Sequence, residues 1–252
     1  MIGEVTVETA VLAIFLAFCR VGACFMLMPG LSSVRVPMQV RLFISVAVSL
    51  ALFAHMWESI VPLVETGSGQ LFTLIGSELL IGAVIGLVAR FYLLAIQFIA
   101  STIAMVSGFN AMVSVSIEET DPQSPLAAII SLSALIVLFV FDFHHAILRA
   151  LVDTYEIMPI EALFNPQIAL ISLADTMSDA FFVMIRLGSP FLAYAILVNL
   201  AIGLVNKLTP QIPIYFVALP FVIAGALIMM YFAIPPMLSL MADGFLPSTI
   251  GL

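Results

Sequence analysis

The chain has 252 residues, of which 63% are hydrophobic and 9% are charged, and only seven of them are Lys or Arg. This composition cannot supply the mixed-charge surface that a soluble domain of this length needs, so it indicates a polytopic, membrane-type protein. The net charge is −8 and the basic residues form no cluster, which argues against nucleic-acid binding and against docking on anionic lipid.

Six apolar runs follow one another along the chain, separated by polar or Pro-containing segments. We expect helices over residues 9–28, 42–57, 71–106, 126–141, 180–205 and 214–240. The connections are a polar hinge at 31–41, an acidic loop at 58–70, a small-residue segment at 107–125, a long polar insert at 153–179 and a turn at 206–213. The sequence therefore predicts an all-α protein.

Several runs have lengths that do not suit a helix surrounded by lipid. A helix needs about 20 residues to cross a hydrocarbon core of about 30 Å. The runs 42–57 and 126–141 are shorter, whereas 71–106 is too long for one crossing and marginal for two, with Arg90 at the expected turn. The last two runs contain interior prolines, whose freed carbonyls need partners: Pro190, Pro220, Pro235 and Pro236. We therefore expect kinked helical hairpins that pack largely against other protein.

Four charged residues lie inside apolar runs: Arg20, Glu78, Arg90 and Arg186. A charge in the middle of a membrane costs at least about 2.5 kcal/mol, so each needs a reason. One interpretation is a proton or substrate path. The interpretation we favour is pairing between helices, for example of Glu78 with one of the arginines, which fixes their register. Gly82 and Gly86 form a GxxxG spacing that permits close helix approach.

No catalytic or metal constellation is recognisable in the sequence. Asp142, His144 and His145 lie close together in the chain, but adjacent histidines diverge by about 100° on a helix. We therefore expect an interfacial helix end there rather than a metal site. Cys19 and Cys24 are expected to be buried hydrophobes. The sequence predicts a protein that is not an enzyme and has no cofactor.

Four segments, taken in order, resemble the FliR family of bacterial flagellar export-gate proteins and its injectisome counterparts. They are CRVGACFMLMPGLSSVRVPMQVRL, ELLIGAVIGL, GFNAMVSVSIEETDPQSP and VNLAIGLVNKLTPQIPIYFVALP. The resemblance spans nearly the whole chain. Its most specific residues are Arg20, Pro29, Pro37, Arg41, Asp121, Pro122, Asn199, Gly203, Pro210 and Gln211.

The resemblance implies a structural role in type III secretion. The chain would assemble with FliP-type and FliQ-type subunits into a helical, hetero-oligomeric export gate in the bacterial inner membrane, within the flagellar basal body. Unfolded export substrates would pass through its channel, and FlhB-type and FlhA-type subunits would be further partners. Residues 1–180 would form a FliP-like part and residues 181–252 a FliQ-like helical hairpin.

The resemblance also implies a plug loop that closes the resting pore, at about residues 109–120. Gly108 lets the chain leave helical geometry there. The middle of the segment has too little apolar bulk for a span and too much for a freely solvated loop. The residues expected to form the plug are Phe109, Asn110, Ala111, Met112, Val113, Ser114, Val115 and Ser116.

The alternative is a stand-alone secondary transporter for a small solute. Such transporters usually contain internal repeats with matched broken helices around a site at the membrane midplane. Here Arg20 and Pro29 have no counterpart in the second half of the chain. The sequence does not separate a flagellar from an injectisome gate, and its basic residues are too few to set a topology.

Overall fold

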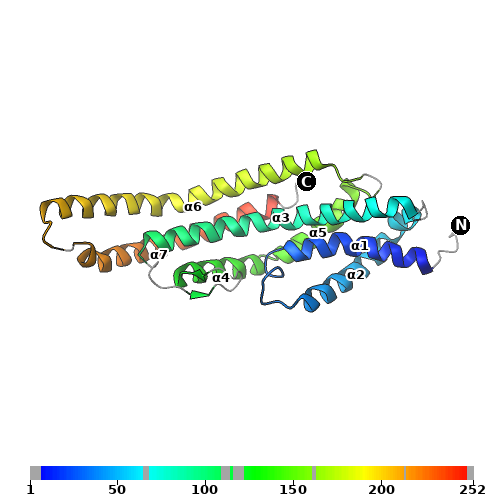
Figure 1. The fold of residues 1–252 in the computed structure, drawn as a ribbon, viewed down its shortest axis with the longest axis horizontal. Helices are drawn as coiled ribbons and strands as arrows, with labels where there is room; N and C mark the ends of the chain where they lie inside the picture. Colours follow the sequence, from blue (N-terminus) through cyan, green and yellow to red (C-terminus); the bar gives the residue numbers. More distant parts are fainter. Residues whose placement is uncertain are drawn as a thin grey trace. The chain divides into compact units, whose positions relative to one another are not determined.

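The computed structural model describes residues 7–64, 68–108, 114–115, 122–160, 163–212 and 214–248, with side chains for 7–53, 71–108, 124–160, 163–212 and 214–236. These residues form long helices and one pair of two-residue strands (Figure 1). The helices are α1 (Val7–Leu27), α2 (Met38–Val64), α3 (Ser68–Val106), α4 (Pro125–Val140), α5 (Phe143–Ile157), α6 (Pro166–Leu208) and α7 (Ile214–Ser248). The predicted all-α fold class is confirmed.

The third apolar run is one continuous helix. α3 has 39 residues and passes through Arg90 without a break, so the turn considered there is absent. The physical reason is local: residues 87–106 contain neither Gly nor Pro, and a single Arg is a good helix former.

The prediction of a long polar insert between helices at 153–179 is largely wrong. α5 continues to Ile157, and α6 already begins at Pro166. Asn165 starts α6, because its Oδ1 accepts hydrogen bonds from the backbone N–H groups of Gln167 (3.0 Å) and Ile168 (3.4 Å). Pro166 has a fixed φ that suits the first helical position. The N-cap Asn165 and the proline at the first helical position thus favour a helix here despite the polar composition of the segment.

Four of the described helices are long and apolar enough to cross a membrane: α1, α3 over 71–106, α6, and α7 over 214–236. α4 and α5 are separated by a short break and count together as a possible fifth span. The protein is therefore a membrane protein with several apolar spans.

The chain divides into two compact units. The first contains residues 1–91, 142–177 and 246–252. α1 and α2 lie side by side in it (Figure 1). Its main core brings together Leu16 of α1, Phe53 of α2, Leu74 of α3 and Tyr155 of α5. A smaller cluster packs Val84 and Val88 of α3 against Ala169 of α6.

The second unit contains residues 92–141 and 178–245. Its core packs Ile99 and Ile103 of α3 against Ile130 of α4 and Phe191 of α6, with Met229 of α7 at the edge. α4 begins with a capped turn, in which Ser124 Oγ accepts a hydrogen bond from the Ala127 N–H and Pro125 occupies the first turn.

Candidate functional site

A buried ion pair joins α1 to α3 in the first unit. The side chains of Arg20 and Glu78 are 0% and 1% exposed. Arg20 Nε donates to Glu78 Oε2 and Arg20 Nη2 donates to Glu78 Oε1, both at 2.7 Å. This fork-to-fork geometry is the strongest form of an Arg–carboxylate contact. The pairing that the sequence analysis suggested for Glu78 is thus present, with Arg20 as the arginine.

The arginine also reaches α5. Its Nη1 donates to Thr154 Oγ1 and its Nη2 to the Met158 carbonyl, both at 3.2 Å. The guanidinium carbon lies 3.7 Å from the centre of the Tyr155 ring, which is a cation–π distance. These contacts satisfy the desolvated charge from several sides, which a buried ion pair requires. Arg20 therefore connects α1, α3 and α5.

Two glycines allow this pair to form at close range. Gly82 and Gly86 follow Glu78 at intervals of four, so the three residues share one face of α3. A Cβ on Gly82 would overlap the backbone carbonyl of Arg20. A Cβ on Gly86 would lie 2.7 Å from the Cys24 carbonyl oxygen, which is also too close. The GxxxG spacing thus marks the contact between α1 and α3.

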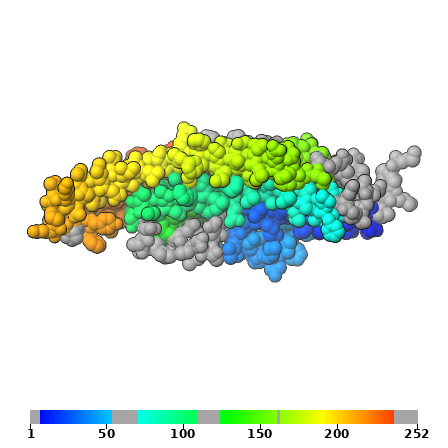
Figure 2. All heavy atoms as spheres, turned by 45° about the horizontal axis from the view of Figure 1, so that its top comes forward, coloured from blue at the N-terminus to red at the C-terminus, as the bar shows by residue number. Residues whose placement is uncertain are grey.

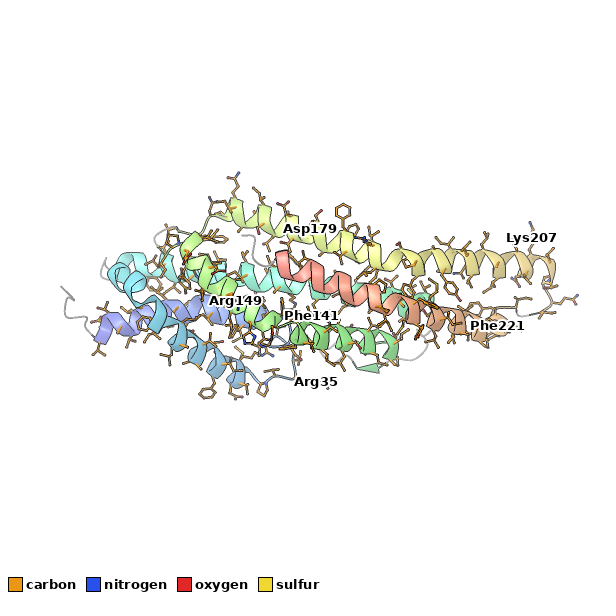
Figure 3. The ribbon with its side chains drawn as sticks, turned by 180° about the vertical axis from the view of Figure 1, so that it is seen from behind. Arg35, Phe141, Arg149, Asp179, Lys207 and Phe221 are labelled. Atoms are coloured by element: carbon orange, nitrogen blue, oxygen red, sulfur yellow. The ribbon has the colours of Figure 1, made fainter. Side chains whose placement is uncertain are left out.

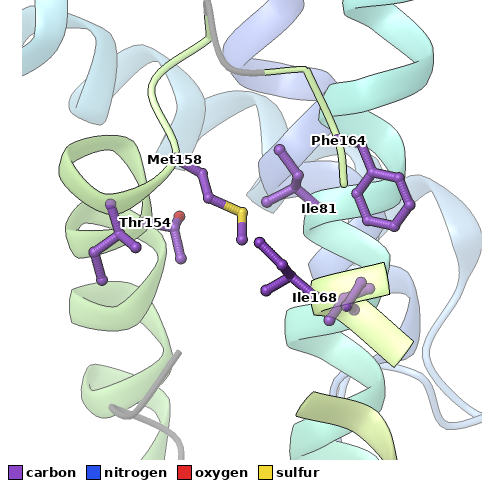
Figure 4. Close-up of a pocket in the computed structure, with 8 residues that line it drawn as sticks. Ile81, Thr154, Met158, Phe164 and Ile168 are labelled. Atoms are coloured by element: carbon purple, nitrogen blue, oxygen red, sulfur yellow. The ribbon is translucent and has the colours of Figure 1, made fainter. Parts of the chain in front are cut away.

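A small apolar hollow of about 20 Å³ adjoins this network. Thr154 and Met158 line it on one side, and Ile81, Phe164 and Ile168 complete it (Figure 4). The hollow has room for about one water molecule and is too small for a substrate.

The hinge between α1 and α2 is held by Arg41. Its Nε and Nη2 donate to the Val36 carbonyl at 3.1 and 2.9 Å, and Nη2 also donates to the Ser33 carbonyl. Pro29 is fully buried, and Gly30 has a φ of 84°, which favours glycine. The Pro37 carbonyl accepts the first backbone hydrogen bonds of α2. These positions of the motif therefore shape one compact hinge.

The other predicted buried charges lie elsewhere. Arg90 is half-buried in α3. Arg186 of α6 is exposed and borders a hollow that is also lined by Pro190 and Phe232. Neither arginine belongs to the network around Glu78. A role for them in assembly stays a prediction.

The C-terminal motif residues lie on the surface of the second unit. Asn199 is exposed and lines a hollow of about 200 Å³ together with Gly108 and Tyr215. Gly203 is exposed, and a Cβ there would meet nothing within 4 Å. Pro210 and Gln211 lie in the exposed turn before α7. Packing among the described residues of the single chain explains none of these four positions.

The expected plug segment lies mostly outside the described residues, which omit 109–113 and 116–121 and therefore Asp121. α3 ends at Val106, and Gly108, with a φ of 77°, turns the chain away from the helix, as its sequence position suggested. The short strands β1 (Ser114–Val115) and β2 (Pro122–Gln123) pair antiparallel, with Ser114 opposite Gln123 and Val115 opposite Pro122. The backbone of the segment is thus tied together near α4.

Sequence reasoning missed the partners that Arg20 finds on α5. Thr154 and Tyr155 are separated from Arg20 by more than 130 residues, and no spacing rule relates them. A weak signal was available, because residues 143, 147, 150, 151 and 154 form one buried face of a helix.

The model of the family "Bacterial export proteins, family 1" matches residues 11–247. The chain is 28% identical over 205 residues to the flagellar biosynthetic protein FliR of Caulobacter vibrioides, covering 81% of each chain. It is 21% identical to FliR of Aquifex aeolicus, over 96% of this chain and 93% of the relative. It is 25% identical to the Yop proteins translocation protein T of Yersinia pestis, over 89% and 87%. Because the family model covers almost its whole length, this chain belongs to the bacterial export proteins, family 1, the family of the FliR-type components of the flagellar export apparatus.

Proposed function

We propose that the chain is a structural subunit of a type III secretion export gate. It would pack with FliP-type and FliQ-type subunits around a channel that passes unfolded flagellar proteins out of the cytoplasm. FlhA-type and FlhB-type subunits would be further neighbours, and the gate would lie in the inner membrane within the flagellar basal body. Membership of the export family supports this role, and the surface of the chain supports the assembly.

The observation that carries the assembly is the exposed apolar surface of α6 and α7. Only 22% of the apolar stretch of α6 and 6% of that of α7 are buried inside the chain. Figure 3 shows side chains along both helices, with Lys207 and Phe221 labelled, and Figure 2 shows α6 (yellow) at the visible surface. Large apolar side chains are exposed along them: Phe182, Leu197, Leu200, Phe216, Phe221 and Phe232. Such surfaces need an apolar cover, which either lipid or another subunit can supply.

Two further features favour protein rather than lipid as the main cover. α6 contains Pro190, and α7 contains Pro220 and the pair Pro235–Pro236. Prolines free backbone carbonyls, which neighbouring helices satisfy better than hydrocarbon does. Asn199 of α6 and Gln211 of the turn before α7 add exposed polar groups. In this proposal residues 181–252 are the FliQ-like hairpin and residues 1–180 the FliP-like part.

The same proposal assigns residues 109–120 to a plug of the resting pore. Gly108 turns the chain out of α3, and the β1–β2 pairing ties the segment at Ser114–Val115 and Pro122–Gln123. Among the described residues, the β1–β2 pairing joins only two residue pairs, so opening it would break few backbone hydrogen bonds.

Co-expression tests the assembly. We expect that expression together with FliP-type and FliQ-type subunits from one operon yields a monodisperse complex on gel filtration in mild detergent. Expression without them should yield less and more heterogeneous material. An equally abundant, monodisperse monomer or homodimer in both cases would contradict the gate and favour a solute transporter.

A deletion tests the plug separately. Removing 111–116 should leave the complex intact on gel filtration but make the membrane permeable to ions and small molecules, which slows growth on overproduction. The matched control removes no residue and replaces 111–116 by a Gly/Ser sequence of equal length, which should leak less than the deletion. An assembled deletion variant with unchanged permeability would refute the plug and leave the assembly proposal intact.

A further inference from the structure

The start of α5 brings together three side chains that suit a metal ion. Asp142 precedes the helix, and His144 and His145 belong to its first turn. Each offers one ligand atom, and these atoms all lie within 4.8 Å of one another. In the sequence, the group lies between Phe141 and Arg149, both of which are labelled in Figure 3. None of these residues takes part in the Arg20 network or in the motif of the export family.

The expectation that the adjacent histidines point apart is wrong. Their ring centres are 4.1 Å apart, with the rings tilted by 41°. The helical angle of about 100° separates their Cα–Cβ bonds. In the first turn, however, no preceding helical turn restricts the side-chain rotamers, so the rings can rotate toward each other.

Asp142 is directed at the histidines rather than at the helix backbone. It occupies the N-cap position, where an aspartate usually accepts a backbone hydrogen bond from the first turn. Here it adopts left-handed angles, φ 56° and ψ 28°, and its side chain makes no capping hydrogen bond. Instead, Oδ1 lies 3.2 Å from His145 Nδ1. Both side chains are mostly exposed in the single chain.

We propose that Asp142, His144 and His145 bind one divalent transition-metal ion of the zinc class. Two imidazoles and a carboxylate are ligands that zinc, cobalt and nickel accept. Zinc–ligand bonds of about 2.0–2.2 Å place two ligand atoms of one ion at most about 4.4 Å apart. The observed spread of 4.8 Å is slightly wider than this limit, so the three side chains would have to move together when the ion binds. Three protein ligands leave at least one coordination position for water.

The ion would tie the residue before α5 to the first turn of that helix. It would thereby hold the left-handed turn at Asp142 and stabilise the folded chain by mass action, because the unfolded chain does not preassemble the three ligands. This inference does not rest on the export function.

Metal titration of the purified full chain in mild detergent tests the site. After treatment with a chelator and its removal, Zn²⁺ is titrated by calorimetry at neutral pH, and Co²⁺ by visible absorption. We expect one saturable equivalent per chain and a higher melting temperature with Zn²⁺. His144→Ala, His145→Ala and Asp142→Asn should each weaken Zn²⁺ binding about tenfold or more. His55→Ala alters the remaining histidine of the chain and should leave the affinity unchanged.

Absence of saturable Zn²⁺ binding by the wild-type chain would overturn the proposal without reference to any variant. So would an Asp142→Asn variant with wild-type affinity, because it would reduce the site to adventitious binding on a pair of surface histidines. Melting curves without metal should match the wild type for the three site variants, since Asp142 and His145 are exposed and His144 is half-buried.

Discussion

In the first compact unit, buried charge joins three helices, whereas in the second unit two long helices are linked by a tyrosine and a glycine. Arg20 contacts Glu78, Thr154 and Met158 at full burial. In the second unit, Tyr194 of α6 donates to the Val222 carbonyl of α7 at 3.0 Å and covers Gly225. About half of the apolar stretches of α1 and α3 is buried inside the chain, against 22% for α6 and 6% for α7.

The difference in burial between the two units indicates which interactions a subunit must complete by itself. A desolvated charge is costly until its partner is present, so Arg20 and Glu78 need each other within one chain. An exposed apolar face in a membrane costs little, because lipid covers it until another subunit does. The buried charges of the first unit are therefore satisfied within the chain, whereas the apolar surface of the α6–α7 hairpin is left for lipid or another subunit to cover.

The largest effect is expected from Arg20→Leu. It leaves the Glu78 carboxylate buried without its arginine, which typically costs about 3–5 kcal/mol. We expect a sharp loss of folded protein and of assembled gate, measured by yield, melting temperature in detergent and gel filtration. Arg20→Lys keeps the charge but loses the fork, so its loss should be smaller.

The double variant Arg20→Met/Glu78→Leu is the control for this prediction. It removes both charges and fills similar volume, so much of the stability should return. If Arg20→Leu assembles normally and only transport changes, the ion pair is part of a functional path instead of a structural link.

Gly82→Ala should have the next largest effect. Its new Cβ would overlap the Arg20 carbonyl, so α1 and α3 must separate and the ion pair must lengthen. Overpacking of this kind costs about 1–3 kcal/mol in free energy of unfolding. Gly76→Ala is the matched control on the same helix, because nothing lies within 4 Å of its Cβ. It should be neutral or stabilising by up to about 1 kcal/mol. Equal melting temperatures for the two variants would show that the close approach of α1 and α3 at Gly82 does not limit stability.

The sequence predicted the features that follow from local rules. The apolar runs located the described helices other than α5 (Phe143–Ile157), which no run predicted. The cost of a buried charge singled out Arg20 and Glu78, and the spacing of Gly82 and Gly86 indicated a close contact. The helix over 166–179 was missed because most of its polar side chains are exposed, although Asn165–Pro166 was a start signal. Thr154, Tyr155 and Met158 could not be assigned to Arg20, since only the packing of α5 brings them there.

A smaller effect is expected from Tyr194→Phe in the α6–α7 hairpin. The ring still covers Gly225, and only the hydrogen bond to the Val222 carbonyl is lost. Such bonds between membrane helices contribute about 0.6 kcal/mol on average. We expect a slightly lower melting temperature. Tyr231→Phe is the control on α7, because Tyr231 is 74% exposed, and it should show no change. A drop as large as that of Gly82→Ala would mean that the hairpin is as strongly self-stabilised as the first unit.

The smallest effect on the chain alone is expected from Gly203→Ala. A Cβ at this exposed position of α6 meets nothing within 4 Å, and alanine favours a helix over glycine. The isolated chain should therefore melt at the same or a slightly higher temperature. If Gly203 serves close approach by another subunit, the same methyl group should reduce recovery of the complex with FliP-type and FliQ-type partners. Ala201→Ser adds one atom on a different side of α6 and should assemble normally. Normal assembly of Gly203→Ala would show that this part of α6 faces lipid or solvent, and the interface would then have to lie on α7.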